Sequence, residues 1–512
     1  MMIISSMLLV FVTVLFMLLL IRQFRKCGSS PDHHHQKLPP GPARLPIIGH
    51  LHLINDLPHR TFQKLSAQHG SLMYLQLGCI PTLVVSSSDM ARDIFKNHDL
   101  VFSGRPVLYA AKRLTYNCST LSFAPYGDYW RQMRKIVMLE LLSSRRVRGF
   151  QAIRSRELKV FLDSIAVTSA NSSSVNLSEM TLLLSNKIVS KIAFGKKMHE
   201  DDDKNIGKFH EMLRETQELL GGFCVADFFP WLGWINKFNG LDRRIQKNLR
   251  ELDDFFNTVI NEHRDSSSYN NKHEEQEEDE DLVDVLVRLQ KDLNQPISIT
   301  DGQIKGVLMD IFVAGTDTSS ATLVWIMAEL IRNPDSMKKA QEEVRKVAKR
   351  KQMVEEEDLG SLKYLKSVVK ETLRLHPPAP LLVPRETRDV CRIKGFEIPA
   401  KTRVFVNAKS IGTEAKEWQN PEEFKPERFP KSSVDCGYGG QFEMLPFGAG
   451  RRGCPGINFA MPMVELALAN LLHLFDWKLP SGMKSEELDM EEAFGITMHK
   501  KSHLCVIPCP PY

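Results

Sequence analysis

A glycine-rich loop near the C-terminus carries a cysteine that could bind a metal. Residues 446–456 read Pro-Phe-Gly-Ala-Gly-Arg-Arg-Gly-Cys-Pro-Gly, and an apolar run with helical spacing, 457–475, follows at once. The glycines allow a tight turn around a flat group. A place at a helix start, with Pro455 as the first helical residue, favours the thiolate form of Cys454. Such a thiolate can be an axial ligand of haem iron and favours O–O bond cleavage.

This cysteine could also have a structural role or belong to a zinc site. A lone cysteine beside glycines is more often a buried structural residue. A zinc site needs further ligands, but the nearest cysteine, Cys436, is distant in the sequence and no Cys-x-x-Cys pair exists. The loop carries a longer pattern, formed by Phe447, Gly450, Arg452, Cys454 and Gly456. This pattern matches the F-x-x-G-x-R-x-C-x-G loop of the cytochrome P-450 family, so the chain resembles a haem-thiolate monooxygenase with haem b as its cofactor.

A second group of reactive side chains lies upstream. Residues 314–319 read Ala-Gly-Thr-Asp-Thr-Ser within a long apolar run. The small side chains of Ala314 and Gly315 would let that helix approach a flat cofactor, and Thr318 can interrupt local backbone hydrogen bonding and hold water. In the family that the chain resembles, the matching acid and alcohol deliver protons during oxygen activation, which implies this role for Asp317 and Thr318. The alternative is an ordinary buried helix with a satisfied Asp-Thr pair.

The resemblance also implies which residues would hold the haem propionates. Trp130 and Arg134 form a W-x-x-x-R pair one helical turn apart, Arg385 lies in the segment LLVPRE, and Arg452 lies in the cysteine loop. Arginine suits this task because its planar guanidinium group binds a carboxylate through two hydrogen bonds. Each of these arginines taken alone could be a surface residue.

A buried ion-pair network is implied by the E-x-x-R motif of Glu371 and Arg374, which lie on one face of a helix. The motif occurs elsewhere in the chain, but here a His-Pro-Pro sequence ends the helix and PERF follows at 426–429. In the family, the arginine of PERF completes the network, which gives this part to Arg428. Breaking a buried pair costs about 3–5 kcal/mol, so these three residues are expected to be structural and not catalytic.

The substrate side is implied by the same resemblance, which covers essentially the whole chain and is strongest to the plant A-type microsomal group. That group oxidises terpenoids, alkaloids, coumarins and other phenylpropanoids. Its pocket would be lined from 104–123, 219–224, 311–315, 379–383 and 494–497. The uncharged candidates are Ala314, Gly315, Ala379, Leu381, Leu382, Val383, Phe494 and Ile496. An apolar cavity implies an apolar small substrate, with a terpenoid or alkaloid favoured; plain core packing is the alternative for each side chain.

Electrons would have to come from another protein. The chain has no nucleotide-binding fingerprint, so we expect NADPH to act through a separate reductase. Arg131, Lys135 and Arg451 are candidates for a basic docking surface, and a merely solvated surface is the alternative. Two other functions remain open, a hydroperoxide-rearranging enzyme without a reductase and a haem-binding sensor without turnover. The Asp317–Thr318 pair counts against both.

The N-terminal segment predicts a membrane anchor. Residues 1–21 contain three polar side chains and no charge, which suits a helix that crosses a bilayer. Arg22, Arg25 and Lys26 follow and predict that the rest of the chain stays in the cytosol. A cleaved signal peptide is the alternative, but its basic start and its cleavage site are missing. The proline-rich segment 37–49 would be a stiff hinge, so we expect a single-pass protein of the endoplasmic reticulum membrane.

Composition limits the remaining possibilities. The chain has 512 residues, 43% of them hydrophobic and 25% charged, so most of it should fold around a core. A net charge of +5 is too small over this length to indicate nucleic acid as a partner. Nine cysteines are too few for a disulfide scaffold.

The elements that position these groups are mostly helical. Short strands are predicted at 72–78, 82–87 and 402–408, and the acidic stretch 265–281 is predicted to be a surface loop. The expected fold is mainly α with a minor β-sheet portion, the cytochrome P-450 fold, preceded by one transmembrane helix. The predicted division is an anchor at 1–21, a linker at 22–50 and one monooxygenase domain at 51–512.

Two residues depart from the expected patterns. Pro462 lies inside the helix after the cysteine loop, where it removes a hydrogen bond. Lys409 occupies a position where the family usually has tryptophan, which puts the local packing in doubt.

Overall fold

The computed structural model describes residues 37–171, 173–195, 203–269, 280–292, 298–431, 441–493 and 495–511. The predicted membrane-spanning segment 1–21 therefore lies outside the described residues, together with the first part of the linker.

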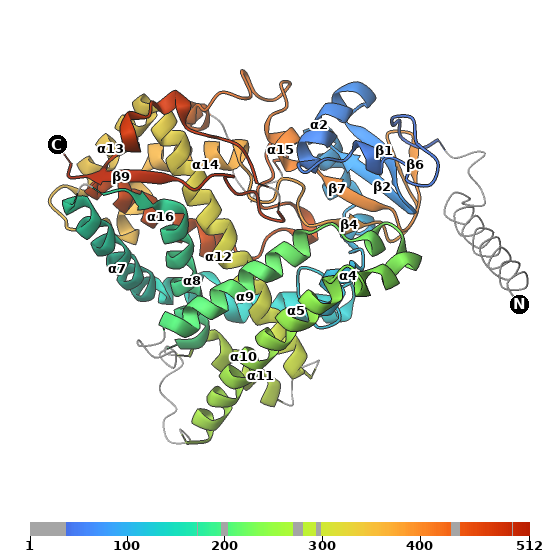
Figure 1. The fold of residues 1–512 in the computed structure, drawn as a ribbon, viewed down its shortest axis with the longest axis horizontal. Helices are drawn as coiled ribbons and strands as arrows, with labels where there is room; N and C mark the ends of the chain where they lie inside the picture. Colours follow the sequence, from blue (N-terminus) through green and yellow to red (C-terminus); the bar gives the residue numbers. More distant parts are fainter. Residues whose placement is uncertain are drawn as a thin grey trace, which may run out of the picture.

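One long helix, α12 (Asp301–Arg332), runs through the middle of the molecule (Figure 1). It begins at a capping box, in which the Thr300 hydroxyl accepts from the N–H of Gln303 while the Gln303 side chain accepts from the N–H of Thr300. The helices with the most contacts to it are α8 (Leu177–Phe194), α14 (Lys363–Leu375) and α16 (Ile457–Leu474).

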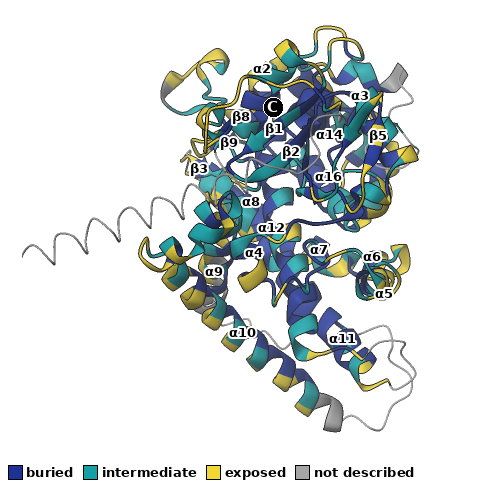
Figure 2. Ribbon diagram, turned by 90° about the vertical axis from the view of Figure 1, so that its right-hand side faces the viewer, coloured by how far each residue is buried: buried dark blue, intermediate teal, exposed yellow. Residues whose placement is uncertain are grey.

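The other long helices are α2 (Pro58–His69), α5 (Asp128–Ile136), α7 (Gln151–Ala170), α9 (Asp203–Gly221), α10 (Leu241–Tyr269), α11 (Leu282–Lys291) and α13 (Pro334–Ala348). Short helices are α3 (Ser88–Arg92), α4 (Tyr109–Leu114), α6 (Ser144–Gly149) and α15 (Ala408–Gly412). Figure 2 shows that α12, α8 and α16 are largely buried, whereas α10 exposes one side. The first three helices therefore form the interior of the molecule and α10 lies at its surface.

Two of these helices, α12 and α16, are long and apolar enough to cross a membrane. Their most apolar stretches are 72% and 61% buried inside the structure, so packing within the fold accounts for their composition. Within the described ranges, these two apolar segments are core helices.

The β-sheet portion is small, and its main sheet lies near α2 and α15, whereas β9 lies at the opposite side of the molecule (Figure 1). The main sheet has the order β1-β2-β7-β4, with β1 (Leu72–Leu77), β2 (Ile80–Val85), β7 (Arg403–Val406) and β4 (Arg385–Glu386). β2 pairs antiparallel with β1 and parallel with β7, in a register that sets Val84 opposite Phe405. The smaller sheets are β3 (Val175–Asn176), β9 (Cys505–Cys509) and β8 (Asp476–Lys478) in that order, and the hairpin of β5 (Cys391–Ile393) with β6 (Phe396–Ile398).

The predicted fold class, mainly helical with a minor sheet, is confirmed for the described part of the chain. The strands predicted at 72–78, 82–87 and 402–408 are β1, β2 and β7, with every end within two residues of the prediction. The acidic loop was predicted to begin at 265, but α10 continues to Tyr269. Sequence analysis did not predict β4, because a two-residue strand carries no periodicity.

Candidate active site

Cys454 lies in a turn immediately before α16. Its backbone N–H donates to the Phe447 carbonyl at 2.9 Å, which closes the loop, and the Gly456 N–H donates to the Cys454 sulfur at 3.3 Å. Helix α16 begins at Ile457, so Pro455 belongs to the turn and is not the first helical residue that the sequence predicted. Cys454 lies just before a helix, as expected, and Pro455 is part of the turn between them.

Two glycines of this loop are required by the backbone. Gly448 and Gly450 have φ angles of +67° and +68°, a region that favours glycine. A Cβ atom on Gly450 would also lie 2.3 Å from a carboxylate oxygen of Asp99. The loop therefore depends on glycine both for its turn and for the close approach of Asp99.

Burial raises the pKa of the Cys454 thiol. The Gly456 N–H and the charge of Arg134 act in the opposite direction but are the smaller effects. The Gly456 N–H thus favours the thiolate, as expected near a helix start, but burial outweighs this effect in the polypeptide by itself. A cysteine of this kind is deprotonated by the metal that it binds.

Three buried arginines lie beside the cysteine loop. Arg105, Arg385 and Arg452 are at most 8% exposed, and burial lowers the pKa of each, to about 10 for Arg385 and about 9 for Arg452. Neighbouring guanidinium groups lower the pKa of Arg105 and Arg452 further. Asp99 lies 3.6 Å from Arg385, but it also forms a 2.8 Å ion pair with Arg451. This excess of buried positive charge fits a ligand that brings its own carboxylates, as haem does.

The predicted propionate residues come together around this cluster. The Trp130 indole N–H donates to the Leu121 carbonyl at 3.0 Å, and the Arg452 guanidinium lies 4.3 Å from the centre of the Trp130 ring. The Arg134 guanidinium lies 6.0 Å from the same ring, and its charge acts on Cys454 and Arg452. Arg452 also donates to the carbonyls of Ser103, Leu121 and Ala124.

Two residues of this region were missed by sequence analysis. Arg105 donates to the carbonyls of Val383 and Pro384 at 2.6 and 2.7 Å, which ties the 104–123 loop to the segment before β4. Asp310 of α12 accepts from the Ser122 hydroxyl at 2.6 Å, and burial raises the pKa of this carboxyl to about 6. A signal existed for Asp310, an acid inside the apolar run, but Arg105 has none because its partners are distant in the sequence.

One face of α12 beside the cysteine loop is not covered by protein. Ala314 is exposed and Ile311, Gly315 and Thr318 are half-buried, although α12 is otherwise a core helix. A Cβ atom on Gly315 would lie 3.7 Å from Phe459 of α16, so this face runs next to the helix that follows Cys454. The small side chains of Ala314 and Gly315 would let a flat group approach this face closely.

Asp317 and Thr318 make different contacts from those that the sequence predicted. Asp317 is 4% exposed, and its Oδ1 lies 2.9 Å from the Nε2 of His499, a partner that sequence analysis missed. The Thr318 hydroxyl donates to the Ala314 carbonyl at 2.6 Å, and α12 continues through this turn. Thr318 therefore does not interrupt the helix; it bonds back to the preceding turn.

The E-x-x-R pair is fully buried. Arg374 binds both carboxylate oxygens of Glu371 at 2.8 and 2.9 Å, and Arg428 donates to Glu371 at 3.1 Å. Arg374 also donates to backbone carbonyls of Gly412 and Pro421. These contacts fasten α14 to the end of α15 and to the segment before 426–429.

A small apolar cluster gathers four of the five predicted pocket segments. Its members are Leu108, Ala111, Cys118, Phe123, Leu220, Val383 and Ile496. A Cβ atom on Gly221 would lie 2.7 Å from the backbone N of Ile496, so the end of α9 rests directly on the 495–496 backbone. Ala379 is half-buried, whereas Leu381 and Leu382 pack in the two apolar clusters beside the main sheet. Phe494 lies outside the described residues.

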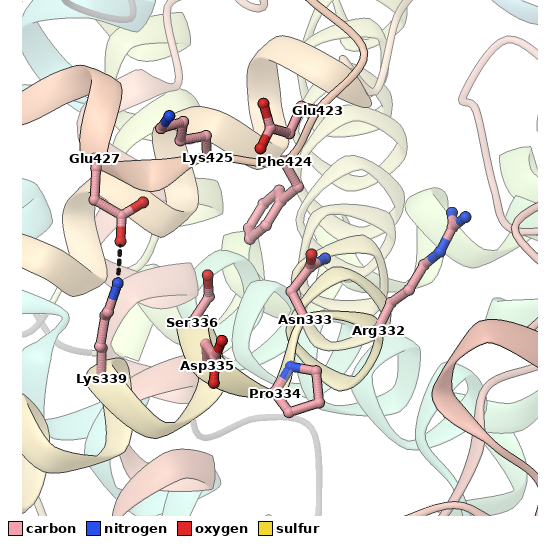
Figure 3. A pocket seen from close by; sticks show the side chains of 10 residues that line it. All are labelled: Arg332, Asn333, Pro334, Asp335, Ser336, Lys339, Glu423, Phe424, Lys425 and Glu427. Atoms are coloured by element: carbon pink, nitrogen blue, oxygen red, sulfur yellow. Dashed lines mark hydrogen bonds and ion pairs between the residues drawn. The ribbon is translucent and has the colours of Figure 1, made fainter. Parts of the chain in front are cut away.

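A separate open pocket of about 510 Å³ lies at the C-terminal end of α12 (Figure 3). Its lining is mostly polar and includes the 2.6 Å ion pair of Lys339 with Glu427. None of the predicted site residues lines this pocket, and a polar, open surface does not suit an apolar substrate. We therefore place the active site at the uncovered face of α12 and not here.

The predicted reductase-docking surface carries less net positive charge than the sequence suggested. Arg131 forms an exposed ion pair with Asp128, and Arg451 is paired with Asp99. Lys135 is exposed on α5. Two of the three charges are therefore partly neutralised in the folded chain.

The chemistry of these groups narrows the class of protein to one that binds haem through a cysteine thiolate. Comparison with known families leads to the same class. The family described as Cytochrome P450 matches residues 39–506, and the chain belongs to this family.

Three similar proteins from this family are plant enzymes. The chain is 62% identical to Cytochrome P450 71A9 of Glycine max, over 98% of both chains. It is 52% identical to Strychnine-11-hydroxylase of Strychnos nux-vomica, over 97% of this chain and 95% of the relative. It is 45% identical to Premnaspirodiene oxygenase of Hyoscyamus muticus, over 96% of both chains. The predicted resemblance and the enzyme class, a cytochrome P450 monooxygenase, are thereby confirmed.

A zebra fish cytochrome P450 solved with progesterone has the same fold, with a TM-score of 0.75. The two chains are 24% identical, and the match covers 89% of this chain and 99% of the other. This likeness concerns the fold alone.

Proposed function

We propose that the protein is a membrane-bound monooxygenase that inserts one atom of O2 into an apolar plant specialised metabolite, with electrons from NADPH delivered by a reductase. Haem b, when bound, supplies oxygen activation and the transfer of one oxygen atom. The observation that carries the proposal is Cys454 at the start of a core helix, beside a buried excess of arginine.

The residues around the loop fit haem. Cys454 would be the axial ligand, and Phe447 and Gly456 hold the turn on either side of it. Trp130, Arg134, Arg385 and Arg452 would receive the propionates, and Arg105 adds a further cation. Bringing two carboxylates into this cluster would relieve the repulsion between the guanidinium groups.

Asp317 and Thr318 are proposed to handle protons, Thr318 on the uncovered face of α12 and Asp317 buried next to it. The Asp317 Oδ2 is buried and has no hydrogen-bond partner among the described side chains. An acid with a free oxygen can accept and release a proton, provided that water or a hydroxyl reaches it. The Thr318 hydroxyl would have to release the Ala314 carbonyl in order to donate elsewhere.

The substrate class follows from the apolar lining. The apolar side chains that gather here, Phe123, Val383 and Ile496 among them, favour an apolar molecule with few polar groups. Two of the relatives are named for strychnine, an alkaloid, and for premnaspirodiene, a terpene hydrocarbon. A terpenoid or an alkaloid is therefore the first choice, and a coumarin or phenylpropanoid the next.

Membrane attachment is proposed from the composition of the N-terminal segment 1–21 and from exposed apolar side chains of the described residues. The hinge is docked on the body, since the Tyr74 N–H donates to the Pro40 carbonyl at 2.9 Å and the Gly78 N–H to the Ile48 carbonyl at 3.1 Å. Exposed apolar side chains lie on the hinge and on the segment after α9, namely Ile47, Ile48, Phe223, Trp234 and Phe238. Exposed apolar side chains suit contact with lipid, which is consistent with the endoplasmic reticulum membrane and with catalysis on the cytosolic side.

The test uses the full chain purified with its haem. The CO-bound ferrous protein should have the red-shifted absorption of thiolate ligation, and Cys454→Ser should abolish it. Terpenoids and alkaloids would be screened for haem spin-state shifts, and the hits incubated with NADPH and a reductase. Retention of the band in the variant would exclude Cys454 as the ligand. Product formation from a hydroperoxide without reductase would support the rearranging enzyme instead.

A further inference from the structure

Asp317 has a partner from the other end of the chain. The Nε2 atom of His499 lies 2.9 Å from the Oδ1 atom of Asp317. Asp317 itself is buried, whereas 38% of the His499 side chain is exposed. His499 is therefore the accessible partner of this buried carboxylate.

The position of His499 is set by its neighbour in the sequence. The Trp325 indole N–H, two turns further along α12, donates to the Met498 carbonyl at 2.9 Å. The Met498 N–H donates to the Pro378 carbonyl at 2.8 Å, and the His499 carbonyl accepts from the Ala493 N–H at 2.8 Å. The backbone on both sides of the imidazole is thus attached to the body, so the contact with Asp317 does not depend on a free loop.

The charged groups near this contact have partners of their own. On the same segment, Lys501 pairs with Glu491 at 2.7 Å, and Lys500 donates to the Ser502 carbonyl at 2.8 Å. Glu492 pairs with His59 and Arg60. Burial lowers the pKa of His499, but the hydrogen bond and the charge of Asp317 outweigh it, so the net pKa of His499 is raised. Among the described groups, Asp317 is the charge that acts on His499.

We propose that His499 is a positioning and proton-relay residue, which holds the Asp317 carboxylate on α12 and passes protons to it from water. The inference rests on the proposed function, in which Asp317 delivers protons. In each transfer the Nε2–H bond of the imidazolium breaks and an O–H bond forms on Asp317, which leaves two neutral groups. The imidazole then takes a proton from water at its accessible side, and Asp317 regains its charge when it passes its own proton on.

The first test does not need turnover. Full-length protein labelled with ¹³C-histidine would be titrated by NMR in the diamagnetic CO-bound ferrous state, with His499 assigned through His499→Gln. The His499 pKa should lie above the ordinary histidine value and should fall in Asp317→Asn, because the carboxylate charge is lost. Equal pKa values in the two proteins would overturn the pairing, whatever the outcome of activity measurements.

The second test compares His499→Gln with His503→Gln, an exposed histidine on the same segment. Glutamine can still donate a hydrogen bond to Asp317 but cannot carry a proton. We expect His499→Gln to keep its CO-bound spectrum and its KM, to lose kcat by about tenfold or more, and to make less product per NADPH. In the wild type and in the control, kcat should fall at alkaline pH because His499 is then deprotonated. This alkaline decrease in kcat should be absent from His499→Gln.

The two proposals fail in different ways. If His499→Gln matches the control in kcat, coupling and pH profile, the relay is overturned and the monooxygenase proposal stands. If the wild type forms no product with NADPH and reductase, the proposed function fails, and the NMR comparison still decides whether Asp317 binds His499.

Discussion

The Nζ of Lys409 donates to the carbonyl of Leu375 at 2.7 Å, and Leu375 is the last residue of α14. Lys409 is 7% exposed, and burial lowers the pKa of its ammonium group. A helix leaves its last carbonyls without partners, so a cation there both donates a hydrogen bond and complements the helix dipole. The lysine that departs from the family pattern therefore has a structural task, to cap the helix that carries Glu371 and Arg374.

Replacing this lysine tests the capping contact. Lys409→Met leaves the Leu375 carbonyl buried without a donor, which should cost about 1–3 kcal/mol of unfolding free energy. Thermal and denaturant unfolding of the CO-bound protein would measure the change. Lys64→Met, an exposed lysine on α2, is the matched control and should change little. Equal effects of the two substitutions would show that the cap contributes nothing.

The ion pair of Glu371 with Arg374 should be essential for holoprotein. Arg374→Ala leaves the fully buried Glu371 carboxylate without its main cation, so the unfolding free energy should fall by about 3–5 kcal/mol. We expect a large loss of CO-binding protein per total protein. Arg214 belongs to another E-x-x-R match but is exposed, with a surface ion pair to Glu218. Arg214→Ala should therefore be nearly neutral, and a similar loss there would point to a non-specific effect.

The environment of Glu492 predicts that the unfolding free energy falls at acid pH. Burial alone would raise the pKa of this carboxyl, but the His59 and Arg60 contacts lower it from 4.5 to about 2. Because the folded pKa is depressed, the stabilisation is complete above pH 4.5 and is lost as pH falls towards 2. The shift corresponds to about 3 kcal/mol at neutral pH. Glu492→Gln should flatten unfolding free energy across this range relative to the wild type, and an unchanged slope would contradict the assignment.

Gly450 should not tolerate a side chain. Its positive φ, and the 2.3 Å that would separate an added Cβ atom from an Asp99 oxygen, predict that Gly450→Ala distorts the cysteine loop. We expect this variant to lose more haem than the wild type on gel filtration. We also expect its CO-bound absorption band, which reports thiolate ligation, to be lost faster. Gly482→Ala has a similar φ but open space around it, so it separates backbone strain from collision. Equal haem loss in both variants would leave Asp99 without a part in the effect.

Thr318 should affect coupling more than stability. Thr318→Ala removes a hydroxyl that bonds back to the Ala314 carbonyl, and α12 keeps its main-chain hydrogen bonds without it. Product per NADPH should fall while haem content and melting temperature stay near the wild type. Full coupling in this variant would remove Thr318 from proton delivery.

Pro462 lies inside helix α16, where a proline is normally unfavourable. Proline removes the hydrogen bond to the carbonyl four residues earlier, that of Asn458. Asn458 is exposed, so water can serve that carbonyl, and α16 continues from Ile457 to Leu474. The cost that the sequence predicted is thereby reduced, and no functional account is needed.

Contiguous motifs determined much of this protein in advance. The cysteine loop, the E-x-x-R pair and the Asp317–Thr318 pair each act over a few neighbouring residues, so local spacing is enough to find them. Strand patterns likewise predicted β1, β2 and β7, and a long apolar run predicted the core helix α12, because buried positions favour apolar side chains.

Only the tertiary structure decided which distant groups meet. His499 faces Asp317, Arg105 joins Arg385 and Arg452, and Lys409 caps α14, although none of these pairs is close in the sequence. The same packing buries Cys454 and thereby raises its pKa against the effect expected from a helix start. Side-chain type limits what a group can bind, but burial and the neighbour across the fold decide its charge and its partner.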